Sequence, residues 1–178
     1  MRTIAKPQPG EYAPYTLDYM KLVADDGLVL QHLETSLSAV ETVINEIPAA
    51  WLTKPCAENE WTVQEILVHI MDTERIFGYR ALRVARADLT ELAGFDQDTF
   101  VASSGANQRS LGSIWAEYTS IRAATLSLFN SFDDAAYVRV GAANKNPLSV
   151  RAALYIIAGH ELHHLKSIRE NYGGRSST

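Results

Sequence analysis

The sequence has very little cysteine, since Cys56 is the only one in 178 residues. A single cysteine forms no internal disulfide and supplies no cysteine-based zinc site, so the composition is typical of a reducing compartment. Long apolar runs are also missing: no stretch of 18 or more apolar residues occurs, which excludes a membrane-spanning helix. The first ten residues lack the apolar segment of a signal peptide. We therefore expect a cytoplasmic protein without a membrane partner.

Turn residues and positive charge are scarce as well. Glycine and proline together number only 16, too few for the many turns of an all-β domain. The formal net charge is −5, which argues against nucleic-acid binding through a broad basic face. Apolar residues, by contrast, make up 47% of the chain, close to the average for soluble globular proteins. The length and composition therefore predict one domain with a real core.

Four long stretches repeat apolar residues at alternating spacings of three and four, the period of an amphipathic helix. They cover residues 25–47, 62–88, 111–132 and 149–172. Each stretch has one apolar stripe, and four such stripes can bury one another. The sequence therefore predicts an all-α fold, a four-helix bundle.

The connections between these helices differ in length. Residues 48–61 and 133–148 are expected to be loops of moderate length, whereas residues 89–109 form a long connection between the second and third helices. A long crossover allows the third helix to lie other than antiparallel to the second. We expect a short helical turn within the crossover, at Asp96 to Val101.

The remaining segments lie at the two ends of the chain. Residues 1–22 hold three prolines and are expected to form an extended N-terminal arm. Residues 23–172 form the single bundle domain, and residues 173–178 are expected to form a flexible tail after two glycines that end the last helix.

Three histidines interrupt the apolar stripes. His160 and His164 are four residues apart, so they lie on one face of the last helix, and that face is apolar. His69 lies at the edge of the apolar stripe of the second helix. Imidazoles are the commonest ligands of zinc and similar ions, so these three side chains can hold one divalent metal. The alternative is that all three are hydrogen-bonded core residues without a metal. His163 and His32 lie off the stripes and are expected at the surface or an edge.

Two glutamates also lie near the centres of apolar stripes, Glu74 on the second helix and Glu161 on the fourth. Each is a candidate catalytic residue that moves a proton, a further metal ligand, or a carboxylate that orients a ligand histidine. The alternative is an ion pair with Arg80 or Arg122. The residues alone do not choose between these roles.

Residues 160–164 also match the H-E-x-x-H pattern of metalloproteases. We reject that interpretation, because only 14 residues follow His164 and none of them is a histidine that could serve as a third ligand. A di-iron carboxylate site needs two Glu-x-x-His pairs, and only Glu161 with His164 supplies one.

Two segments carry a family resemblance. Residues 61–75, WTVQEILVHIMDTER, and residues 159–164, GHELHH, resemble signature segments of the DinB/YfiT-like family. Residues 79–88 and 94–96 also resemble that family, so the resemblance extends over nearly the whole chain, roughly residues 15–172. It implies a four-helix bundle with a long crossover in which His69, His160 and His164 hold a divalent metal, zinc or nickel.

The resemblance also implies a range of functions. Characterised relatives include metal-dependent thiol S-transferases, an isomerase that uses a low-molecular-weight thiol, and proteins described as hydrolases, and many are homodimers. We therefore expect a metal-dependent transferase or hydrolase acting on a small molecule. The alternative is a non-catalytic bundle that binds a metal or a small ligand.

Two further expectations concern surfaces. The N-terminal arm and the long crossover should border the metal site, so that Phe95, Asp96 and Phe100 select the substrate. Ile76, Leu82 and Trp115 lie off the stripes, and exposed apolar side chains there would favour a homodimer.

Overall fold

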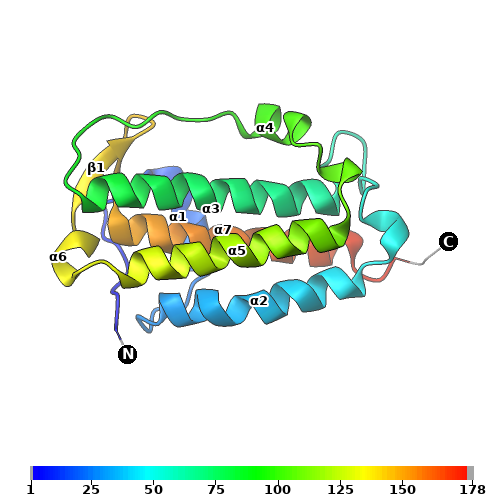
Figure 1. Ribbon diagram of the computed structural model, residues 1–178, viewed down its shortest axis with the longest axis horizontal. Coiled ribbons are helices and arrows are strands. Elements are labelled where there is room, and N and C mark those ends of the chain that lie inside the picture. Colours follow the sequence, from blue (N-terminus) through cyan, green and yellow to red (C-terminus); the bar gives the residue numbers. More distant parts are fainter. Residues whose placement is uncertain (1, 176–178) are drawn as a thin grey trace.

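The computed structural model describes residues 2–175 and shows a bundle of four long helices (Figure 1). These are α2 (Val29–Glu46), α3 (Val63–Ala85), α5 (Leu111–Asn130) and α7 (Val150–Tyr172). In Figure 1, α3 and α5 run in one direction while α2 and α7 run in the other. The long connection returns along the bundle between α3 and α5, so the all-α fold with its crossover is confirmed. Within the described residues, no helix is long and apolar enough to cross a membrane.

Shorter elements fill the connections. They are η1 (Pro14–Thr16), α1 (Leu17–Lys21), η2 (Ala49–Trp51), α4 (Gln97–Ser103), η3 (Ala106–Gln108), α6 (Asp134–Tyr137), β1 (Val140–Ala143) and β2 (Asn146–Ser149). Helix α4 is the expected turn in the crossover. The expectation of a plain loop at 133–148 was wrong, because α6 and an antiparallel hairpin lie there. The N-terminal arm is likewise not extended throughout, since it contains η1 and α1. Residues 176–178 of the expected tail lie outside the described residues.

Local chemistry explains where the long helices begin and end. A capping box precedes α3, with the Thr62 hydroxyl accepting from the Glu65 amide and the Glu65 carboxylate accepting from the Thr62 amide. Helix α3 ends at Ala85, earlier than predicted, because Ala87 adopts a left-handed conformation with φ 59°. Helix α2 begins at Val29, later than predicted, because Gly27 adopts φ 75°.

The hairpin turn places two residues other than glycine in the left-handed region. Asn144 has φ 52° and Lys145 has φ 62°, as a two-residue type I′ turn requires. The hairpin also holds the crossover, because the Leu92 amide donates to the Ala142 carbonyl and the Asn144 amide donates to the Leu92 carbonyl. The turn therefore fixes one segment of the long connection against the bundle.

Replacing Lys145 with glycine is expected to stabilise the protein by up to about 1 kcal/mol, because glycine adopts a positive φ without the steric cost of a side chain. The backbone amide at this position, which donates to Glu91, is kept. Urea unfolding measures the effect, with Lys145→Ala as the matched control that retains the strain. Equal gains from glycine and alanine would show that the backbone conformation is not the cause.

The apolar core has two parts. One part lies inside the half of the bundle near the hairpin, and the other lies inside the half near η2. The first includes Val29, Leu33, Phe77, Phe129 and Leu154, and the second includes Val40, Ile44, Leu67, Ile114 and Ile168. Between them lies a polar layer with one residue from each long helix: Ser36, Glu74, Arg122 and Glu161.

Arg122 is the centre of this polar layer and is fully buried. Its Nε and Nη2 donate to the two carboxylate oxygens of Glu74 at 3.0 and 2.9 Å, and Nη2 also donates to Glu161. Its Nη1 donates to the Ser36 hydroxyl at 2.7 Å. Burial acts against the charge, but Glu161 and Glu74 hold the pKa of Arg122 above its ordinary value. One guanidinium thus connects all four helices and fixes their relative register.

The three side chains expected at a dimer surface are not fully exposed. Ile76, Leu82 and Trp115 are each half-buried. Trp115 packs against the core and stacks on the ring of Tyr118 at 5.8 Å between centroids. The expectation that these three side chains are exposed is therefore wrong, and the homodimer itself stays a prediction.

Candidate metal centre

The three histidines come from two helices that pack side by side, α3 and α7. The start of α7 is fixed by Ser149, whose hydroxyl accepts from the Ala152 amide. Gly159 then allows α1 to approach α7 closely, because a Cβ at this position would lie 2.1 Å from the backbone oxygen of Tyr19. The Tyr19 ring consequently packs edge-on against His160, at 5.3 Å between centroids.

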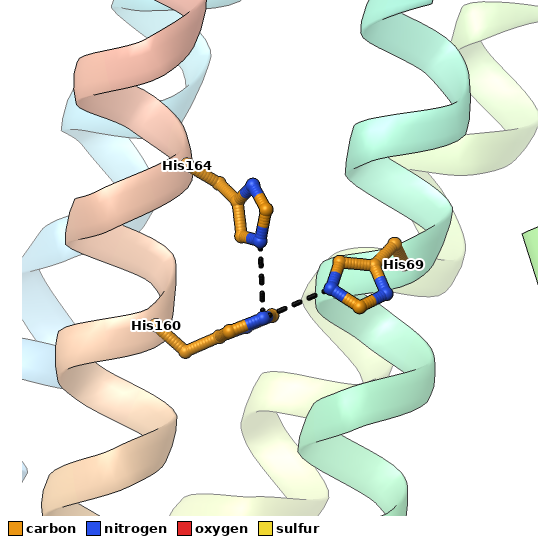
Figure 2. A group of neighbouring side chains, drawn as sticks. All are labelled: His69, His160 and His164. Carbon is orange, nitrogen blue, oxygen red and sulfur yellow. Dashed lines mark hydrogen bonds between the residues drawn. The ribbon is translucent and has the colours of Figure 1, made fainter. Parts of the chain in front are cut away.

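His69, His160 and His164 meet at one point (Figure 2). The Nε2 atom of His160 lies 2.9 Å from that of His69 and 3.0 Å from that of His164. One ring nitrogen from each residue lies within 4.8 Å of the other two. The structure therefore brings together the three histidines selected from the sequence.

Hydrogen bonds alone explain this arrangement poorly. A neutral imidazole nitrogen carries either one proton or one lone pair, so Nε2 of His160 can form only one good hydrogen bond. It nevertheless faces a nitrogen of both His69 and His164. Three lone pairs directed at a common cation satisfy all three nitrogens at once. Tetrahedral ligands at zinc–nitrogen distances of 2.0–2.1 Å lie about 3.3 Å apart, a few tenths of an ångström more than the two Nε2 separations at His160. The residues present fit a divalent metal.

The environment keeps these imidazoles neutral, the form that binds a metal. Burial lowers the pKa of His69 to about 4. Burial together with the neighbouring histidines lowers the pKa of His164 to about 3 and that of His160 well below its ordinary value. The Trp61 ring, 4.8 Å from the ring of His69, is part of the cover over the cluster. All three side chains therefore stay ready to bind a cation at neutral pH.

The stability of the metal-free protein should fall as the pH drops from about 6.5 towards 4. In the unfolded chain a histidine has a pKa near 6.5, whereas the folded pKa of His69 is about 4. Between these values only the unfolded chain takes up the proton, so the free energy of unfolding rises with pH. Melting temperatures in chelator between pH 7 and 5 test this. His164→Gln should flatten the slope and His163→Ala should not, and an equal slope in both would contradict the assignment.

The two candidate glutamates lie apart from the histidines. Glu74 and Glu161 both pair with Arg122, and the Tyr118 hydroxyl also donates to Glu161. Among residues 2–175, no hydrogen bond joins either carboxylate to the histidine cluster. These contacts favour the ion-pair alternative, and a role in proton transfer stays a prediction.

The other two histidines lie where the sequence placed them. His163 is exposed on α7, with its ring edge-on to Tyr19. His32 is half-buried near the surface, and its Nε2 lies 2.9 Å from a carboxylate oxygen of Asp26.

A cavity of about 230 Å³ opens beside the cluster and includes His69 and His160 in its lining. The N-terminal arm and the crossover border it, as expected, and Phe95 lines it. Asp96 caps α4 and does not line the cavity, and Phe100 packs on Phe95 while remaining 44% exposed. Sequence reasoning missed the contribution of Asn144 from the hairpin turn.

Sequence reasoning also missed Thr73 and Arg80 as cavity residues. A signal was available for Thr73, because it lies one helical turn, four residues, after His69 on the same face of α3. Arg80 lies on that face two turns further on, although the sequence offered it only as a partner for a glutamate.

Comparison with known proteins agrees with this architecture. Residues 32–168 match the model of the DinB superfamily. Among solved structures, the fold is similar to that of YfiT from Bacillus subtilis, described as a probable metal-dependent hydrolase with an unusual four-helix bundle topology. The TM-score is 0.70 at 16% identity, over 94% of this chain and 91% of that one. At this identity the similarity establishes the fold alone. No curated protein matches the chain.

Proposed function

The chain belongs to the DinB superfamily, and on that premise we propose that it is a metal-dependent enzyme, a hydrolase or thiol S-transferase, that acts on a small molecule. The observation that carries the proposal is the convergence of three neutral imidazoles, with Nε2 of His160 2.9 and 3.0 Å from its two neighbours. His69, His160 and His164 would hold one divalent ion, and zinc or nickel suits such a ligand set.

The chain supplies three ligands and a cavity. When bound, such an ion keeps an open position, lowers the pKa of a water there towards 7, and deprotonates a thiol outright. His69 and His160 line the cavity wall, so a substrate placed in the cavity lies next to the ligand set. The buried surroundings hold the imidazoles in place and keep them unprotonated.

One observation favours thiol transfer as the specific reaction. Among the described residues that line the cavity there is no aspartate or glutamate. The cavity wall therefore offers no carboxylate to take a proton from water or to give one to a leaving group, whereas a thiol that the ion deprotonates outright needs no such group. Hydrolysis is favoured by the description of YfiT as a probable metal-dependent hydrolase.

A substrate screen separates the two reactions. Protein purified without a histidine tag would be loaded with zinc or nickel and offered thiol donors with epoxide or chlorinated acceptors, beside esters and amides. We expect turnover in one of the two sets and its loss in chelator. Turnover that persists after the metal has been removed would refute the proposal, and inactivity with every substrate would favour a non-catalytic binding bundle.

We also propose that the protein forms a homodimer, as many relatives in this family do. Exposed apolar side chains occur in and next to the hairpin, where Val138, after α6, is 56% exposed and Val140, in β1, is 45% exposed, and Leu89, at the start of the crossover, is 84% exposed. Burying them against a second copy would remove apolar surface from water. Light scattering should give about twice the chain mass of 19.7 kDa, and Val138→Asp should shift it towards the monomer. A monomer mass for the unmodified protein at micromolar concentration would reject the dimer.

A further inference from the structure

The cavity beside the histidine cluster follows one face of α3. His69, Thr73, Phe77 and Arg80 are spaced by four, four and three residues, so they form a single stripe, and all four line the cavity. Ile156 and Phe95 add apolar surface from α7 and the crossover. The cavity therefore has histidines at one end, an apolar middle, and a guanidinium at the other end.

Arg80 is a buried cation without an anionic partner. The residue is 5% exposed, and the donor contact seen within residues 2–175 is from Nη2 to the Ala93 carbonyl, at 2.7 Å. In that part of the chain, no carboxylate forms an ion pair with it. Glu91 attracts it from further away but accepts the Lys145 amide instead. Burying a charge in this way is costly unless an opposite charge arrives.

The guanidinium also points towards the histidine end. Its carbon lies 5.0 Å from the centroid of the Phe77 ring, three residues earlier on α3. Long helical side chains lean towards the helix N-terminus, so this orientation is the expected one. Along the helix axis, Thr73 is about 6 Å from Phe77 and about 10 Å from Arg80. A ligand that reaches from Thr73 to the guanidinium is therefore a small molecule.

Thr73 supplies the second unmet interaction. It is 3% exposed, and within the described chain its hydroxyl is the one buried side-chain polar atom without a hydrogen-bond partner. Leaving a buried hydroxyl unpaired is unfavourable, because it has lost its hydrogen bond to water. The loop opposite is held close, because a Cβ on Gly94 would lie 2.5 Å from Oδ1 of Asn144. Thr73, whose hydroxyl has no partner within the described residues, therefore lines a cavity with a defined far wall.

We propose that this cavity binds a small carboxylic acid whose carboxylate pairs with Arg80 and whose polar, reacting end lies at Thr73 beside the histidines. That the end of the ligand beside the histidines is the one that reacts rests on the proposed function. Arg80 is then the residue that selects anionic substrates. The planar guanidinium suits a carboxylate, which accepts two parallel N–H bonds. The apolar middle suits a short hydrocarbon or aromatic segment between the two ends.

Calorimetric titration with three probes tests the carboxylate end. The probes are 3-phenylpropionate, its amide, and 3-(4-hydroxyphenyl)propionate, each titrated into zinc-loaded and chelator-treated protein. We expect the acid to bind roughly tenfold or more tightly than the amide, as a charged hydrogen bond predicts. Arg80→Met should abolish this preference, and Arg86→Met, which removes the same charge from the exposed end of α3, should not. Arg80→Lys keeps the charge and should retain part of the preference if Arg80→Met does not fold.

The hydroxylated probe tests the other end. It should bind more tightly than 3-phenylpropionate, and Thr73→Val should remove that gain without lowering the melting temperature of the free protein, because the hydroxyl has no partner there. Equal binding of acid and amide, no binding of either, or an acid preference that survives in Arg80→Met would overturn the proposal. If the protein binds no metal under any condition, the proposed function is refuted. If that metal-free protein still prefers the acid to the amide, this inference stands.

Discussion

Replacing His160 with alanine is expected to abolish metal binding and any metal-dependent turnover. His160 is the central residue of the proposed metal site, because its Nε2 faces the nitrogens of both His69 and His164. Changing a residue that merely supports a ligand typically costs 10–100-fold in affinity or activity, so losing a ligand should cost about 100-fold or more. Elemental analysis of untagged protein and turnover of any substrate found give the two measurements.

The matched control for this variant is His163→Ala. His163 lies on the same turn of α7 but is exposed, and its ring contacts are with Tyr19 and His164. The control should keep about one ion per chain and full turnover. Equal metal content in the two variants would show that the cluster is a group of core residues and not a metal centre.

The second large effect concerns stability. Arg122→Met should lower the free energy of unfolding by about 3–5 kcal/mol, because it leaves the buried carboxylates of Glu74 and Glu161 without their cation. Both carboxylates are at most 2% exposed, so water cannot replace the guanidinium. Urea unfolding measures the loss. The triple variant Glu74→Leu, Arg122→Met, Glu161→Leu should recover much of it, because it leaves no charge unpaired.

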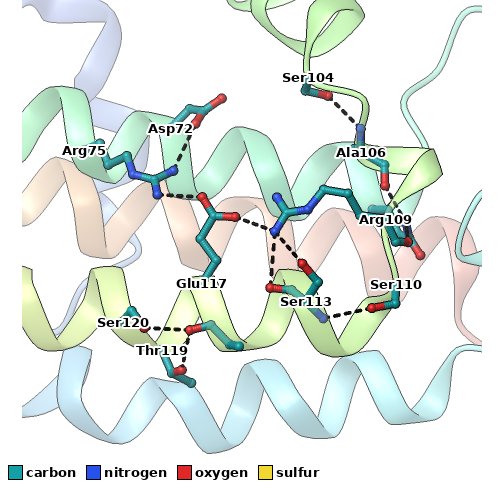
Figure 3. A network of polar contacts seen from close by, with 12 residues as sticks. Asp72, Arg75, Ser104, Ala106, Arg109, Ser110, Ser113, Glu117, Thr119 and Ser120 are labelled. Atoms are coloured by element: carbon teal, nitrogen blue, oxygen red, sulfur yellow. Dashed lines mark hydrogen bonds and ion pairs between the residues drawn. The ribbon is translucent and has the colours of Figure 1, made fainter.

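A surface network provides the control for that experiment. Figure 3 shows Glu117 between Arg75 and Arg109 on the outside of α3 and α5. The Arg75 side chain is 48% exposed, and exposed pairs contribute at most about 1 kcal/mol. Arg75→Met should therefore change the free energy of unfolding several-fold less than Arg122→Met. Similar losses in the two variants would mean that the buried polar layer does not hold the bundle together.

The four long helices were predictable because each has its own signals. Apolar spacing predicted their buried faces, and the stretches predicted to begin at residues 62 and 149 do begin there, where Thr62 and Ser149 cap α3 and α7. The convergence of His69 with the His160 and His164 pair was predictable for the same reason, since the helical period alone turns these imidazoles inward. These features depend on local sequence and on one rule, that apolar faces meet.

Features that depend on tertiary context were not predictable. Residues 140–149 contain glycine, alanine and proline in place of alternating β-branched residues, so the sequence showed no strand pattern. The hairpin forms where the Asn144–Lys145 turn meets the crossover. The partner of the two buried glutamates could be reduced to Arg80 or Arg122, but the choice depends on how α5 is rotated in the bundle. The cavity role of Arg80 required the path of the crossover as well.

The most direct test of the metal centre is X-ray absorption spectroscopy at the metal edge, on untagged protein loaded with zinc. We expect about one ion per chain with three imidazole nitrogens at 2.0–2.1 Å, and the loss of one of these nitrogens, or of the ion, in His160→Ala. A substoichiometric ion, or a ligand shell with fewer than three imidazoles in the unmodified protein, would contradict this expectation.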